Sequence, residues 1–170
     1  DTIEEFREFA ALSEHYDFEG QTIKLGADIV INKGDAYTWA TKAPSYNWTP
    51  IGSIGTRFAG NFNGDNHTIS GLYLNTTSQY AGLFAAFAST AKIENLKIKN
   101  SYFKSTAPDI GSIVGMGDGE LNTIYSEALL DCAGARSGGM VGVVNGADMK
   151  MTNCWFAGTI TNNAMVTGGL

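Results

Sequence analysis

The side chains that could perform acid–base or metal chemistry are few and scattered along this chain. Its two histidines, His15 and His67, belong to no HExxH motif or similar metal-ligand spacing. No G-x-S-x-G nucleophile elbow and no phosphate-binding loop is found either. The sequence therefore predicts no catalytic residue, no metal ligand and no cofactor, and hence a protein that is not an enzyme.

A carbohydrate-active enzyme is the alternative that the acidic residues leave open. A polysaccharide lyase or hydrolase needs clustered carboxylates, often with a calcium ion, and a basic residue on the same face. The candidates are Asp28, Asp35, Asp65 and Arg57. Asp65 lies in an Asn-Gly-Asp-Asn turn, where backbone geometry accounts for it. No acid pair recurs in phase with the repeat described below, so this alternative ranks second.

Aromatic residues between positions 37 and 48 are the best candidates for ligand binding. Tyr37, Trp39 and Tyr46 are the candidates that we single out, and Trp48 closes the run. Exposed aromatic rings stack on sugars or anchor protein partners, so a host glycan or a matrix protein is the expected partner. The alternative is that these rings pack over the first turn of the fold, which we favour for all four and most strongly for Trp48.

The overall charge argues against nucleic acid as a partner. Acidic residues number 17 and basic residues 11, for a net charge of -6. The largest basic group, Lys92, Lys97 and Lys99, lies on a predicted strand and is interpreted as a solvated face. Phosphate binding needs more clustered cations than this. No run approaches the ~20 apolar residues of a membrane span, so no membrane insertion is expected.

The hydrophobic pattern predicts one helix followed by short strands. An amphipathic helix is expected within residues 1–16, capped by Asp1 or Thr2. Beyond it the period changes to two, as in half-buried strands. The expected strands are 21–25, 28–32, 58–62, 68–74 and 93–99, and the expected loop is 33–48.

A repeat of a small residue, two bulky apolar residues and another small residue decides the fold class. Its second positions are 82, 112, 139 and 169, at intervals of 30, 27 and 30 residues. Alternating segments beginning at Ile93, Leu121 and Met149 follow the first three copies. Units of this length bury their apolar faces by stacking on one another.

The repeat therefore predicts an all-β parallel β-helix spanning residues 1–170 as one domain. The helix of residues 1–16 would cap its N-terminal end, and residues 17–170 would form the rungs. The chain stops as a fourth repeat begins, so further β-helix repeats are expected at its C-terminus. Cys132 and Cys154 fall out of phase in the repeat, which predicts two free, buried thiols rather than a disulfide.

Several segments resemble a known family of surface proteins. Residues 48–52, 58–72 and 80–84 resemble the opening segment of GLUG-type bacterial surface proteins, and residues 138–142 and 153–160 resemble the GLUG repeat itself. The same repeat occurs in filamentous-haemagglutinin-like adhesins and in non-catalytic regions of IgA-peptidase-like proteins. The resemblance implies a right-handed β-helix and an extracellular or cell-surface location. We therefore expect a non-enzymatic module for adhesion, ligand display or spacing.

Overall fold

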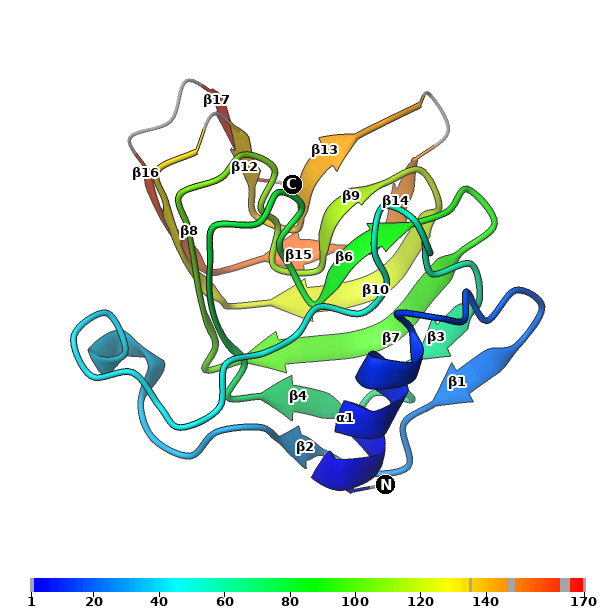
Figure 1. Ribbon diagram of the computed structural model, residues 1–170, viewed down its shortest axis with the longest axis horizontal. Helices are drawn as coiled ribbons and strands as arrows, with labels where there is room; N and C mark the ends of the chain where they lie inside the picture. Colours follow the sequence, from blue (N-terminus) through cyan, green and yellow to red (C-terminus); the bar gives the residue numbers. More distant parts are fainter. Residues whose placement is uncertain (1, 135, 147–148, 163–165, 170) are drawn as a thin grey trace.

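Strands from successive turns of the chain stack in parallel and form a β-solenoid (Figure 1). The computed structural model describes residues 2–134, 136–146, 149–162 and 166–169. In Figure 1 the first sheet rises from β1 and β2 (blue), through β7 and β10, to β14 and β15 (orange). The predicted all-β parallel β-helix with an N-terminal helix is confirmed.

The first sheet has the order β1-β3-β7-β10-β14, with β2 and β4 continuing its lower turns and β15 pairing with β10. Its strands are β1 (Thr22–Lys24), β2 (Ile29–Val30), β3 (Asn61–Asn63), β4 (Thr68–Ser70), β7 (Lys92–Lys99), β10 (Glu120–Ser126), β14 (Lys150–Thr152) and β15 (Trp155–Phe156). The register aligns Phe62, Ile93, Leu121 and Met151 in one column facing the core. Alternation of apolar and polar residues places one side of each strand inside the solenoid.

Two further sheets and a strand pair complete the turns. The second sheet has the order β16-β11-β8-β5, the third β13-β9-β6, and β12 pairs with β17. Their strands are β5 (Tyr73–Thr76), β6 (Phe84–Phe87), β8 (Tyr102–Ser105), β9 (Val114–Gly117), β11 (Leu129–Cys132), β12 (Arg136–Gly138), β13 (Val141–Val144), β16 (Thr159–Asn162) and β17 (Val166–Gly168). Phe84, Val114 and Val141 are register partners, so the predicted repeat is one stacked column.

The N-terminal helix α1 (Ile3–Leu12) covers the core beside the first turns. Its apolar face brings Phe6 onto Trp48, with ring centroids 5.2 Å apart, and Phe9 onto Phe62 at 5.9 Å. Thr2 is the N-cap and forms a capping box with Glu5. The other predicted cap, Asp1, lies outside the described residues.

The helix is shorter than the predicted span of residues 1–16 because its end is pinned by a buried serine. Ser13 is the C-cap. The Ser13 hydroxyl donates to the carbonyl of Ala10 at 2.6 Å and accepts from the amide of Gly52 at 2.8 Å. This hydroxyl therefore joins the end of the helix to the first turn of the solenoid.

Strand boundaries differ from the prediction where the chain bends. The expected strand at 68–74 is divided into β4 and β5 by a corner at Gly71, whose φ is +76°. A Cβ atom there would lie 2.1 Å from the carbonyl oxygen of Asn32. The expected strand at 58–62 begins only at Asn61, and the loop 33–48 contains a short 3-10 helix (Ala36–Thr38).

A column of left-handed residues bends the first sheet at the same place in successive turns. Asn66, Asn95, Thr123 and Asn153 have φ angles of 65°, 54°, 58° and 54°. The amide of Asn66 donates to the carbonyl of Asn95 at 2.8 Å, which links two members of the column. Asparagine tolerates this conformation, whereas a β-branched residue rarely adopts it.

Candidate binding surfaces

The predicted aromatic binding loop is divided by the structure. Trp39 is only 4% exposed, so its ring packs and is closed to a ligand. It lies edge-to-face on Tyr73, with centroids 6.1 Å apart, and Tyr73 stacks on Tyr102 at 6.0 Å. The prediction of Trp39 as a ligand-binding residue is therefore wrong, because the loop folds back onto the outer side of the second sheet.

The other two candidates lie in different surroundings. Tyr46 is half-buried against the main core, and the guanidinium carbon of Arg7 lies 3.8 Å from its ring centroid. The amide of Tyr46 donates to the side chain of Asn32, which fixes the base of the loop. Tyr37 is 76% exposed and borders a depression of about 280 Å³ beside Glu127. The three side chains therefore do not form a single site.

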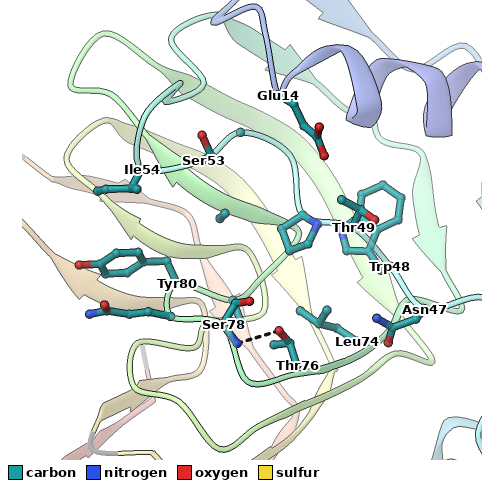
Figure 2. Close-up of a pocket in the computed structure, with 15 residues that line it drawn as sticks. Glu14, Asn47, Trp48, Thr49, Ser53, Ile54, Leu74, Thr76, Ser78 and Tyr80 are labelled. Atoms are coloured by element: carbon teal, nitrogen blue, oxygen red, sulfur yellow. Dashed lines mark hydrogen bonds between the residues drawn. The ribbon is translucent and has the colours of Figure 1, made fainter.

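A groove between segments 47–54 and 74–81 has a volume of about 530 Å³ (Figure 2). Backbone hydrogen bonds hold segment 47–54 against the strands, among them those from Trp48 to the Tyr73 carbonyl and from Ile51 to the Leu83 carbonyl. Figure 2 shows Glu14 reaching from the end of the helix toward one side of the groove. Because the two segments belong to different turns, the sequence carried no local signal for the groove.

Uncharged hydrogen-bonding groups dominate the lining of this groove. The backbone amide of Ser78 donates to the Thr76 hydroxyl at 3.0 Å, and the Asn47 side chain accepts from the amide of Asn75 at 2.8 Å. These bonds fix the shape of the walls. The hydroxyl groups of Ser78 and Tyr80 make no hydrogen bond within the described part of the chain, so they can bind a ligand. Pro50 and Ile54 supply the exposed apolar surface of the groove, because Trp48 and Leu74 behind it are only 1% and 2% exposed.

Charged side chains on the outside of the first sheet pair with neighbours along the sheet. The ammonium group of Lys92 lies 2.8 Å from Glu94 and 3.9 Å from Glu120. Glu94 also accepts from the amide of Asn61 in the preceding turn, at 3.2 Å. The hydrogen bond from Lys92 lowers the pKa of Glu94 below its ordinary value. These acids connect turns of the solenoid.

The acidic residues and the arginine considered for an enzyme site each have a local partner. The contacts are Asp28 with the amide of Thr68 at 2.9 Å and the ring of His67 at 3.1 Å, Asp35 with the amide of Tyr37 at 3.0 Å, Asp65 with Lys24 at 2.9 Å, and Arg57 with Asp118 at 3.9 Å. Over the described residues, no group of three or more His, Cys, Asp or Glu side chains could hold a metal ion. The candidate acids thus act as caps and surface pairs.

One buried carboxylate, that of Asp109, was not predicted from the sequence. Asp109 is fully buried and accepts from two nitrogens of Arg136, at 2.5 and 2.8 Å, and from the amide of Gln79 at 2.9 Å. Burial alone would raise the pKa of Asp109, but the hydrogen bonds from Arg136 and Gln79 outweigh it and lower that pKa. The three residues lie in successive turns, so this carboxylate joins the loops between the second and third sheets.

The two cysteines are free, as the sequence predicted. Cys132 is buried, and burial raises the pKa of its thiol to about 12. Cys154 is only half-buried, contrary to the expectation of two buried thiols. Its sulfur lies 3.6 Å from the carbonyl oxygen of Leu121.

Two known proteins are similar to parts of this chain. A putative Gly-rich membrane protein of Evansella cellulosilytica is 31% identical over 83 residues, which cover 47% of this chain and 10% of that protein. Halomucin of Haloquadratum walsbyi is 27% identical over 150 residues, which cover 84% of this chain and 2% of halomucin. The chain therefore spans a small part of each relative.

No family model matches the chain, and no solved structure matches it. Within the described residues, no helix is long and apolar enough to cross a membrane.

Proposed function

We propose that this chain is a non-enzymatic β-solenoid module of a large cell-surface or secreted protein, and that it serves adhesion, ligand display or spacing. The observation that carries this proposal is the groove of Figure 2. Its walls are held by backbone pairing to the solenoid, and the polar groups that line it include the hydroxyls of Ser78 and Tyr80. Such a preformed, partly apolar hollow with a few polar groups is typical of binding sites.

The chemistry of the groove favours binding over hydrolysis. Glu14 is the one carboxylate among the described residues that line it. Glycoside hydrolases use two carboxylates that face each other across the scissile bond. A groove with one exposed acid can accept hydrogen bonds from a ligand but lacks the second group.

The comparisons support a surface location. One relative is named a membrane protein and the other halomucin, and both are far longer than this chain. The resemblance of residues 58–72 to GLUG-type surface proteins supports the same location. A solenoid fold alone carries no function, so the location rests on these likenesses.

A binding array of host glycans and matrix proteins tests the proposal. We expect the chain to bind at least one ligand, and Tyr80→Ala to reduce that binding by about tenfold, the loss of one well-packed aromatic contact. Tyr16→Ala is the matched control, because Tyr16 is 63% exposed and does not line the groove. Equal binding by Tyr80→Ala and the wild type would remove the groove from the proposal.

The same ligand separates binding from catalysis. Incubation with any bound glycan, followed by mass spectrometry, should show the glycan intact. Glu14→Gln is expected to change neither the product profile nor the fold. Cleavage products that disappear in Glu14→Gln would identify an enzyme and refute the proposal.

A further inference from the structure

A column of outward side chains on the first sheet joins a lysine to two aromatic rings. The register pairs Lys97 with Tyr125 and Tyr125 with Trp155 in successive turns. Parallel neighbours of this kind lie about 4.8 Å apart. Trp155 is 68% exposed, far more than the packed Trp39. This column therefore presents aromatic surface along the direction in which the turns stack.

Polar side chains run beside this column. The left-handed residues Asn66, Asn95, Thr123 and Asn153 border a depression of about 120 Å³, and Trp155 forms part of its rim. Since each turn contributes one short polar residue, amide and hydroxyl groups recur with the spacing of the turns. A ligand lying along the column would meet an aromatic face on one side and hydrogen-bonding groups on the other.

This surface carries two exposed lysines on a chain that is acidic overall. Lys97 and Lys99 are exposed, and neither forms an ion pair within 4 Å in the described part of the chain, whereas Lys92 pairs with glutamate. The ammonium group of Lys99 lies 5.6 Å from the ring centroid of Tyr125.

Two acids lie near this surface. Glu127 accepts from the Tyr125 hydroxyl at 3.0 Å. The pKa of Asp28 is lowered by the amide of Thr68, by the ring of His67 and, least, by the charge of Lys97.

We propose that this surface binds an acidic polysaccharide that runs along the solenoid axis. Sugar rings would stack on Trp155 and Tyr125, and uronate carboxylates would reach Lys97 and Lys99. Lys97, Tyr125 and Trp155 align in successive turns, so a polymer that contacts all three would run along the solenoid axis. Two unpaired lysines are too few for a nucleic acid, whose binding requires many phosphate contacts.

This surface shares no lining residue with the groove of Figure 2, so ligand binding at the two places can be tested independently. The probe is polygalacturonate, measured by isothermal titration calorimetry at low and moderate salt. Its fully methyl-esterified form has the same backbone without the charges and serves as the matched polymer. Dependence on salt follows from the screening of the lysine contacts.

We expect the wild type to bind polygalacturonate more tightly than the esterified polymer. Trp155→Ala should weaken binding at least tenfold, and Lys97→Gln with Lys99→Gln should weaken it and remove most of its salt dependence. Tyr80→Ala in the groove and Lys42→Gln in the exposed loop are controls that should bind like the wild type. Thermal unfolding of each variant verifies that it is folded.

Four outcomes would overturn this assignment. One is the absence of binding to polygalacturonate by the folded wild type. Another is undiminished binding by Trp155→Ala, which would place the ligand elsewhere. Equal affinity for the charged and esterified polymers would reject an acidic ligand. Loss of binding in Tyr80→Ala alone would assign the polymer to the groove instead.

Discussion

Replacing Thr123 by asparagine should stabilise this protein. Thr123 has a φ of 58°, in line with Asn95 and Asn153 of the neighbouring turns. It is the β-branched member of a column otherwise made of asparagine. Its side chain is exposed, and within the described residues its hydroxyl bonds only the adjacent Asn122, at 3.1 Å. Thr123 therefore adopts a strained left-handed conformation, and no buried contact of its side chain compensates for that strain.

The expected gain follows from the cost of the left-handed conformation. That conformation costs an ordinary L-residue roughly 1–2 kcal/mol, and asparagine is largely exempt. Allowing for the lost contact to Asn122, Thr123→Asn should raise the free energy of unfolding by about 1 kcal/mol. For a chain of this size that corresponds to an increase in Tm of about 2–4 °C.

Urea denaturation followed by circular dichroism measures this change, with the m-value expected to stay constant. Thr152→Asn is the matched control, since Thr152 is also exposed but lies in strand β14. Asparagine is disfavoured in strands, so the control should lose up to about 1 kcal/mol. A Thr123→Asn variant no more stable than the wild type would show that the strain argument is wrong.

Three further predictions concern the buried groups. Asp109→Asn should lower the free energy of unfolding by about 2 kcal/mol at pH 7. Because folding lowers the pKa of Asp109, its carboxylate stabilises the protein above the unfolded pKa of about 4, and this stabilisation is lost as the pH falls. The denaturation curves of variant and wild type should therefore converge below that pH. Phe6→Ala should cost about 3–5 kcal/mol, measured by urea denaturation, because the ring stacked on Trp48 covers the core; a loss under about 1 kcal/mol would refute this role. In the native protein, Cys154 should react with a thiol reagent before the deeply buried Cys132; mass spectrometry of timed samples reports the order, and faster labelling of Cys132 would contradict it.

The repeat made the solenoid predictable without a structure. The sequence repeats every 27–30 residues, with small residues at fixed positions. Units of this length bury their apolar faces by stacking on one another. The same pattern identified the core-facing columns, such as Phe84 with Val114 and Val141. These features are periodic, and a period states which residues share a place in successive turns.

Which loop residues are exposed could be known only from the tertiary structure, because loops do not follow the repeat. Tyr37 and Trp39 are two residues apart, yet the first is exposed and the second is buried against Tyr73. The groove likewise needs segments from different turns. Asp109 and Arg136 are 27 positions apart, which is one repeat, so the repeat places them in successive turns. Only the geometry of the corner shows that they form a buried ion pair.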